Sequence, residues 1–368
     1  MSVSASRVAA SRAHTRSVVG AERVWIAAVI GVLFAALTYL WLSVNDPRRE
    51  AGDFTYAWLA ARAILHGREP YAVVLAESPF RSPFFYPLPA ALIAMPVAIL
   101  SARLAGAVFV GAGFSWLSFQ LASGGRGRLL VLTAAPALFA VLAVQWSPLL
   151  TGAALTGPAL GLTIAKPTIG LALAAMVLPS APRASRLFWV TTAVAGSLVL
   201  ASLALRPDWP RHWLAAIGGG GYTTQFRAPI LTVYGFPAVL ALLRWRRPEA
   251  RLLFVLACVR QNGFMYDQLP LLLVPTTAAQ ALTLSVVSHV SHIVALWVPP
   301  ADGSLLALNA QQFPFTVMAM YVPCVVMVLA RPNEGAMPGW VDRVTRYWPR
   351  WVRGTPAPPH PARAKNTR

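Results

Sequence analysis

The chain has 368 residues, of which 57% are hydrophobic and only 12% charged, whereas soluble domains carry roughly 25% charged residues. This composition excludes an ordinary water-soluble protein. The formal net charge is +19, but its arginines gather at the two ends and in short loops, which argues against a nucleic-acid-binding stripe and favours charges that orient a membrane protein.

The N-terminal residues 1–23 form a basic tail that contains Arg7, Arg12, Arg16 and Arg23. The apolar run Val24–Val44 comes next. It is long enough to cross a bilayer and longer than a signal-peptide core, and no convincing small-residue cleavage site follows it. We therefore expect this run to remain as the first transmembrane helix, with the basic tail in the cytoplasm.

A polar loop, residues 45–86, follows and is expected to be extracytoplasmic. Within it, residues 54–66 predict a short surface helix with one apolar stripe. Asp53 comes directly before that helix, and two interpretations compete. The carboxylate is either an ordinary helix N-cap or a general base whose pKa is raised by partial desolvation at the edge of the bilayer.

Residues 24–330 predict one all-α polytopic membrane domain of about ten to twelve transmembrane helices. The candidate spans are 24–44, 87–100, 103–122, 129–145, 147–164, 168–179, 187–205, 229–243, 251–262, 268–283, 285–298 and 310–330. Twelve spans would leave Arg126 and Arg128 outside, against the positive-inside rule. We therefore expect one or two of the middle segments to be half-spans or re-entrant.

Three polar groups interrupt the apolar runs. Lys166 lies before Pro167 in an apolar stretch, where it is either a snorkelling lysine or a fixed cation for a phosphate. Gln145 lies at a helix junction, where it either lines a cavity or makes an interhelical hydrogen bond. Asp267 opens an apolar helix and is either an N-cap or a ligand for sugar hydroxyls.

Other polar features carry weaker signals. His289 and His292 lie three residues apart, but no third metal ligand is evident, so a polar interhelical seam is the better interpretation. The run Gly218–Gly221 lacks the residues of a phosphate-binding loop and predicts a flexible outer loop. Cys258 and Cys324 lie in apolar segments and imply no disulfide. No metal or nucleotide cofactor is expected.

The C-terminal tail, residues 331–368, is rich in proline and arginine. It is expected to be cytoplasmic, and its composition suits a disordered segment or one associated with an anionic lipid surface.

The segments AGDFTYAWLAARAILHGREPY and SPFFYPLPAALIAMP resemble the opening of family 87 of the glycosyltransferases, which are polyprenyl-phosphate-dependent mannosyltransferases of the GT-C fold. Further along the chain, Gln145-Trp146-Ser147-Pro148 resembles a Gly-Gln segment of that family, Lys166-Pro167 its Lys-Pro segment and Tyr266-Asp267 its late Tyr-Asp. The chain departs from the pattern at Val144, where the family usually has glycine.

The resemblance implies an inverting transfer of a hexose, with mannose expected, from a polyprenyl-phosphate donor to an envelope glycolipid or polysaccharide on the extracytoplasmic face of the plasma (inner) membrane. Asp53 would deprotonate the acceptor hydroxyl, and Lys166 with Arg62 would offset charge on the leaving phosphate. The further substrate-binding residues implied are Tyr56, Tyr86, Gln145 and Asp267.

Two other functions remain open at this point. A transporter or lipid flippase would also place Lys166, Asp267 and the two histidines along a path through the membrane, although the sequence shows no internal repeat. A scaffold within an envelope-glycan assembly machine is the third, and the near-absence of soluble interaction domains argues against it.

Overall fold

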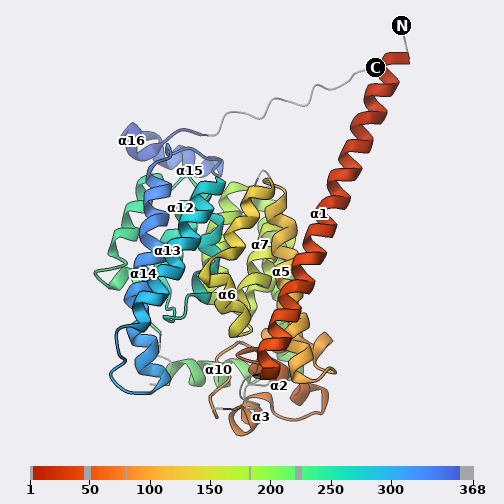
Figure 1. Cartoon of the computed structure of the whole chain (residues 1–368), viewed down its shortest axis with the longest axis vertical. Coiled ribbons are helices and arrows are strands. Elements are labelled where there is room, and N and C mark those ends of the chain that lie inside the picture. Colours follow the sequence, from red (N-terminus) through yellow and green to blue (C-terminus); the bar gives the residue numbers. More distant parts are fainter. Residues whose placement is uncertain (1–2, 45–50, 80, 182–183, 220–225, 357–368) are drawn as a thin grey trace.

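The protein is an all-α polytopic membrane protein. The structure, a computed structural model, describes residues 3–44, 51–79, 81–181, 184–219 and 226–356. Among the described residues, five helices are long and apolar enough to cross a membrane: Gly20–Val44 within α1 (Val3–Val44), α5 (Ala102–Ala122), Ser185–Leu205 within α9 (Ala184–Leu205), α13 (Ala278–Leu296), and Leu306–Leu329 within α14 (Leu305–Leu329). They run side by side (Figure 1). Exposed leucine, valine and tryptophan side chains cover α1, α9 and α13, as a lipid-facing surface requires.

Shorter pieces complete the bundle between these long helices. They are η3 (Arg126–Thr133), α6 (Ala135–Leu142), α7 (Ser147–Leu155), η4 (Pro158–Ala165), α8 (Pro167–Val177), η7 (Phe236–Arg244), α12 (Pro248–Cys258) and η8 (Tyr266–Leu273). Several begin with proline at their first or second position, where its missing N–H costs nothing. The sequence predicted one or two interrupted segments in the middle of the chain, and the described residues there form more short pieces than that.

The predicted span 87–100 is wrong. Its residues form only the six-residue α4 (Pro89–Ala94) and the 3₁₀ turn η2 (Met95–Val97), because α4 begins at Pro89 and Pro96 interrupts the helix soon afterwards. The chain then returns along α5, which packs closely on α1. A Cβ on Gly111 would lie 2.8 Å from the carbonyl oxygen of Gly31, so these two glycines allow the helix backbones to meet.

Arg126 and Arg128 consequently lie at the same end of the bundle as the start of the first span, not at the opposite end as the twelve-span topology required. Arg126 forms an ion pair with Glu22, and Arg128 donates to the carbonyl of Leu273 at 3.4 Å. We call this the basic end.

The predicted break between spans 268–283 and 285–298 is also wrong, since α13 is continuous there and the chain breaks at Pro275 instead.

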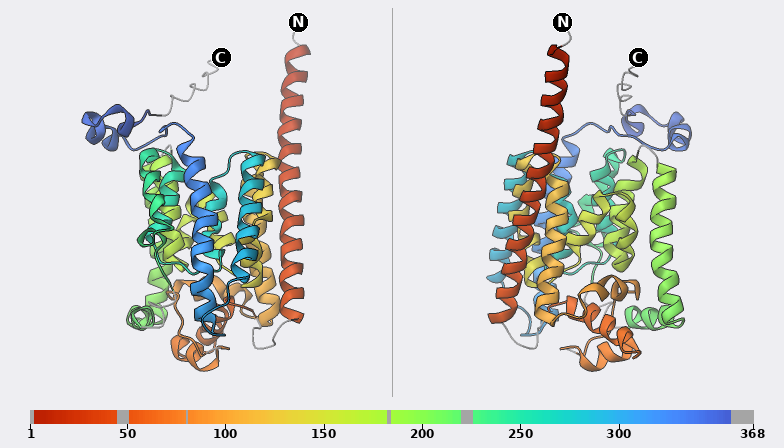
Figure 2. Two further views of the ribbon diagram at one scale, coloured as in Figure 1. Left: turned by 60° about the vertical axis from the view of Figure 1, so that its left-hand side comes forward. Right: turned by 90° about the vertical axis from the view of Figure 1, so that its right-hand side faces the viewer.

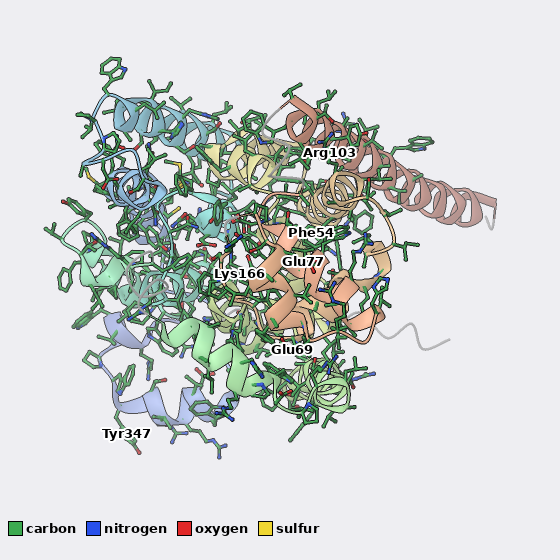
Figure 3. All side chains as sticks on the ribbon, turned by 90° about the horizontal axis from the view of Figure 1, so that it is seen from below. Phe54, Glu69, Glu77, Arg103, Lys166 and Tyr347 are labelled. Carbon is green, nitrogen blue, oxygen red and sulfur yellow. The ribbon has the colours of Figure 1, made fainter. Side chains whose placement is uncertain are left out.

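The opposite end, which we call the loop end, is covered by α2 (Phe54–Leu65), α3 (Pro70–Glu77) and α10 (Trp209–Gly218) (Figures 1 and 2). The helix predicted over 54–66 is confirmed as α2. Seen from this end, α2 and α3 lie across the bundle beside Lys166 (Figure 3). Arg206 at the end of α9 donates to the carbonyls of Gly67 and Arg68 at 2.8 and 2.7 Å, which fastens the turn between α2 and α3.

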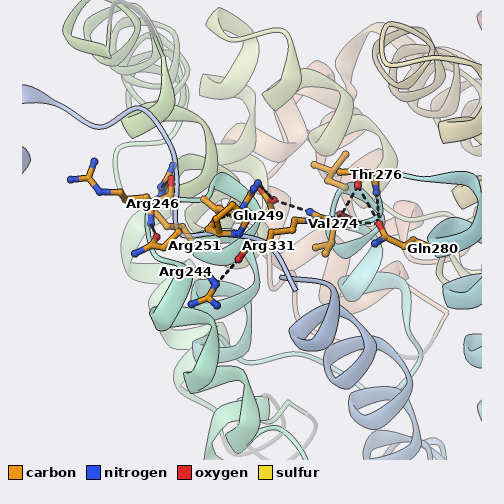
Figure 4. A network of polar contacts seen from close by, with 12 residues as sticks. Arg244, Arg246, Glu249, Arg251, Val274, Thr276, Gln280 and Arg331 are labelled. Atoms are coloured by element: carbon orange, nitrogen blue, oxygen red, sulfur yellow. Dashed lines mark hydrogen bonds and ion pairs between the residues drawn. The ribbon is translucent and has the colours of Figure 1, made fainter. Parts of the chain in front are cut away.

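Hydrogen bonds and ion pairs tie the helices together at the basic end (Figure 4). Glu249 accepts from Arg247 at 3.1 Å and from Arg331 at 2.8 Å. Arg251 donates to backbone carbonyls of α8 and of the turn before α12, and Arg244 donates to carbonyls at the end of α14. These arginines satisfy helix C-terminal carbonyls that would otherwise lack partners.

The part of the predicted tail that the structure describes, residues 331–356, is folded rather than disordered. It forms α15 (Gly339–Val344), η9 (Thr345–Tyr347) and α16 (Arg350–Arg353), held against the basic end. Residues 357–368 lie outside the described part of the chain, as do 45–50 of the predicted loop and two residues, 220 and 221, of the predicted glycine-rich loop. Gly218, the first residue of that run, ends α10.

Candidate functional site

Asp53 is placed by a tight turn at the start of α2. Its backbone N–H donates to the carbonyl of Ala143 at 2.9 Å, so the turn is fastened to the junction between α6 and α7. Gly52 has a φ of +55°, and a Cβ there would lie 2.8 Å from that same carbonyl oxygen, so only glycine fits without displacement. The loop that follows the first span is thus held against the junction between α6 and α7.

The N-cap interpretation of Asp53 is not supported. Asp53 occupies the N-cap position of α2, but its side chain makes no capping hydrogen bond, and the Thr55 hydroxyl accepts from the Ala51 N–H instead. The Asp53 carboxylate turns toward Gln145, whose Nε2 donates to Oδ2. A carboxylate that does not stabilise its own helix is available for other chemistry.

Gln145 directly follows a strained backbone junction between α6 and α7. Val144, directly before it, has a φ of +53° and is fully buried, and a β-branched side chain is strained in this left-handed region. Glycine adopts this conformation freely, which gives a physical reason for the glycine in the Gly-Gln pattern that the segment resembles. The strain marks the point where α6 and α7 separate and the Gln145 side chain enters the site.

Lys166 and Asp267 complete a network with Gln145. The Lys166 ammonium donates to Asp267 Oδ1 at 2.6 Å and to Gln145 Oε1 at 3.2 Å. The side chain of Lys166 is 13% exposed and that of Asp267 is 5% exposed, so the two opposite charges compensate one another in a largely desolvated place. This contact excludes a lysine that merely snorkels to the membrane surface, and Asp267 is in the first turn of η8 rather than at its N-cap.

Burial raises the pKa of the Asp53 carboxyl above its ordinary value, although the Lys166 ammonium and hydrogen bonds from the Tyr266 hydroxyl and Gln145 favour the charged form. Asp53 lies outside the five long spans. A raised pKa brings a carboxylate closer to the range in which it accepts a proton efficiently near neutral pH.

A cavity of about 490 Å³ opens beside this network at the loop end. Asp53, Lys166 and Asp267 line it, and aromatic side chains are the largest group in the remaining lining, which also has several polar and aliphatic residues. The aromatic members are Tyr56, Phe85, Tyr86, Trp213, Phe226, Phe264 and Tyr266, and the polar members include Ser82, Thr168, Arg260, Asn262 and Asn309. Its size and mixed lining suit an organic ligand with both apolar faces and hydroxyl or phosphate groups.

The structure brings together six of the seven residues singled out from the sequence. Five of them line the cavity: Asp53, Lys166, Tyr56, Tyr86 and Asp267. Gln145 does not belong to the lining, but its side chain forms hydrogen bonds with both Asp53 and Lys166. Arg62 lies elsewhere: it is exposed, its guanidinium lies 4.7 Å from the Trp58 ring centroid, and it does not belong to the cavity lining.

Arg260 is the cation at this cavity that sequence reasoning did not single out. Its side chain is exposed, and it has no ion-pair partner within the described part of the chain. The signal for it in the sequence is its place in a short polar stretch, residues 260–268, between two apolar segments. Since its charge is not already balanced, Arg260 is better suited than Lys166 to bind an incoming anion.

The two histidines of α13 belong to a polar interhelical seam. His289 Nε2 lies 2.8 Å from the carbonyl of Thr133, and His292 Nδ1 lies 3.2 Å from the Gln312 side-chain oxygen. Within the described ranges, no group of three or more histidine, cysteine, aspartate or glutamate side chains is arranged to hold a metal ion.

Comparison with protein-family models, curated proteins and solved structures found no match for this chain.

Proposed function

We propose that the protein is an inverting membrane glycosyltransferase that moves a hexose from a polyprenyl-phosphate donor to a hydroxyl of an envelope glycolipid or polysaccharide. The observation that carries the proposal is the Asp53 carboxylate, which is freed from helix capping, fastened by Gln145 and Tyr266, and placed on the wall of an aromatic-lined cavity. The resemblance to family 87 of the glycosyltransferases supports the same reaction and makes mannose the expected sugar.

Asp53 acts as the general base in this reaction. It takes the proton of the acceptor hydroxyl, whose oxygen attacks the anomeric carbon of the donor from the face opposite the phosphate. The bond between the anomeric carbon and the phosphate oxygen breaks, the polyprenyl phosphate leaves with that electron pair, and the configuration of the sugar is inverted. The products are the glycosylated acceptor and polyprenyl phosphate, with the proton on Asp53.

The charges around the cavity support an anionic donor. Lys166 is paired with Asp267, so its main role is to hold Gln145 and thereby Asp53 in place. Arg260 lines the same cavity, and in this proposal its guanidinium offsets the charge that develops on the leaving phosphate. The aromatic walls offer faces on which a pyranose ring packs.

In this proposal the basic end faces the cytoplasm of the cell's inner membrane. Arginines gather at this end, as the positive-inside rule expects of a cytoplasmic side, and both the start of α1 and the C-terminal helices are located there (Figure 1). The cavity then opens on the extracytoplasmic side, where a lipid-linked donor reaches it while its polyprenyl chain stays in the hydrocarbon.

The test is transfer of radiolabelled mannose from synthetic polyprenyl-phosphate mannose to an envelope lipid extract, with purified wild-type protein and the variant Asp53→Asn. We expect Asp53→Asn to lower transfer by about 10²–10⁴-fold at equal expression. Full activity of this variant would refute the role of Asp53. Envelope glycolipids and polysaccharides from cells that lack the protein should also lose one hexose in mass spectra.

Translocation of a lipid-linked sugar is the second candidate, and the buried Lys166–Asp267 pair is the observation that favours it. Proteoliposomes separate the two functions. Movement of polyprenyl-phosphate mannose between leaflets without a new glycosidic bond would support translocation, whereas transfer to acceptor without net movement supports the transferase.

A further inference from the structure

The C-terminal segment 338–353 exposes large aromatic side chains. Trp340 is 62% exposed, Tyr347 is 87% exposed and Trp351 is 69% exposed. Arg343 and Arg346 lie between them and are also exposed. Trp and Tyr prefer the boundary between lipid and water, and arginine is attracted to anionic headgroups. The combination is therefore typical of a surface that meets a membrane interface.

The segment is held rigidly to the bundle rather than loosely tethered. Arg246, which is only 1% exposed, forms an ion pair of 2.5 Å with Asp342 and donates to the carbonyl of Arg353. The Trp245 indole donates to the carbonyl of Val352 at 2.7 Å. The exposed aromatic side chains consequently keep one orientation relative to the spans.

Its position also fits a membrane surface. The segment follows α14 closely, lies at the height where the helices end and projects sideways from the bundle (Figures 1 and 2). In the view along the bundle, Tyr347 lies at the edge of the molecule, far from Lys166 at the centre (Figure 3). A bilayer around the five long helices would have the headgroups of one leaflet at this place.

We propose that residues 338–353 form an interfacial segment that binds anionic phospholipid headgroups of the leaflet at the basic end. The aromatic side chains enter the boundary region, and Arg343 and Arg346 contact lipid phosphates. Residues 338–353 contain one acidic residue, Asp342, and Arg246 neutralises it. The net charge that this segment presents to the lipid is therefore positive. This inference does not depend on the proposed transferase activity.

The experiment uses the full-length protein in nanodiscs of phosphatidylcholine alone or mixed with phosphatidylglycerol. A nitroxide label is attached at Tyr347→Cys in a background of Cys258→Ser and Cys324→Ala. Its collisions with oxygen, which partitions into lipid, and with a water-soluble nickel complex are measured by electron paramagnetic resonance. We expect a label that is accessible to oxygen and shielded from nickel, most strongly with phosphatidylglycerol.

Two double variants separate charge from folding. Arg343→Gln with Arg346→Gln should weaken the shielded state by about fivefold in equilibrium constant for each arginine removed, while Arg343→Lys with Arg346→Lys should keep it. A label open to nickel in both lipids would overturn the proposal. A label shielded from both reagents would also overturn it, because that result indicates a protein partner or a second copy.

Discussion

The Gln145 side chain fixes the Asp53 carboxylate by donating a hydrogen bond from Nε2 to Oδ2. Its other end accepts from Lys166 at 3.2 Å, so the amide cannot rotate without losing both bonds. Gln145→Glu places a second carboxylate beside Asp53, and repulsion should raise the pKa of Asp53 further. Since a base must be deprotonated, the acid limb of the pH–activity profile should move up by about one pH unit or more.

Gln145→Leu is the control for this prediction, because it removes the amide without adding charge. It should lower transfer at every pH and shift the limb less than Gln145→Glu does. An acid limb that coincides for wild type and Gln145→Glu would show that Asp53 is not the group that controls activity at low pH.

The raised pKa of Asp53 also predicts a stability effect. The folded protein binds this proton more tightly than the unfolded chain, in which the pKa is near its ordinary value of 3.8. The stability contributed by Asp53 is therefore present at low pH and lost as the pH rises through the folded-state pKa. At pH 7 the variant Asp53→Asn should unfold at the same temperature as wild type or higher, and this advantage should shrink as the pH falls. A lower unfolding temperature at pH 7 would contradict it.

The Lys166–Asp267 pair predicts coupling between two substitutions. Lys166→Met leaves the Asp267 carboxylate buried without its partner, which should cost about 3–5 kcal/mol of unfolding free energy. Adding Asp267→Leu removes the unpaired charge and should restore most of that loss. Activity should not return, since Gln145 still lacks its donor. Chemical unfolding in detergent gives the stabilities, and additive effects would show that the pair is not coupled.

Arg260 and Arg62 form a matched pair of exposed arginines, one lining the cavity and one stacked on Trp58 away from it. A charge-assisted contact with phosphate contributes about 1.5–3 kcal/mol, so Arg260→Ala should lower kcat/KM for the lipid donor by roughly 10–100-fold. Arg62→Ala should change it little. The opposite ranking would return the phosphate-binding role to Arg62.

The membrane class and the surface helix followed directly from the sequence, since hydrophobic runs and an apolar stripe are local properties. The sequence also identifies Asp53, Lys166 and Asp267 as individual candidate site residues, because a charge among apolar residues is costly wherever the chain folds. Their contacts did not follow from the sequence. The bond between Lys166 and Asp267 joins residues 101 positions apart, and no periodicity in either segment encodes it.

The incorrect and missed predictions also concern properties that the local hydropathy of a segment does not determine. The stretch 87–100 is apolar enough for a span, but Pro96 interrupts the α-helix that begins at Pro89 after fewer than two turns, and hydropathy alone does not account for that effect. Placing Arg126 outside was a consequence of counting that stretch as a crossing. Arg260 was overlooked because one arginine in a polar loop looks ordinary until the fold directs it toward a cavity.

Two glycines with positive φ allow a test of how the site is positioned. Gly52 has a φ of +55°, and an added Cβ would meet the Ala143 carbonyl at 2.8 Å, whereas Gly67 has a φ of +69° with nothing within 4 Å of an added Cβ. Both alanine variants should lose about 1–2 kcal/mol from backbone strain. Gly52→Ala must also push the turn away from Ala143 and so displace Asp53 from Gln145. Transfer should therefore fall sharply in Gly52→Ala and stay near the wild-type rate in Gly67→Ala when measured at a temperature where both are folded. Equal losses of activity would mean that strain alone, and not the position of Asp53, limits the reaction.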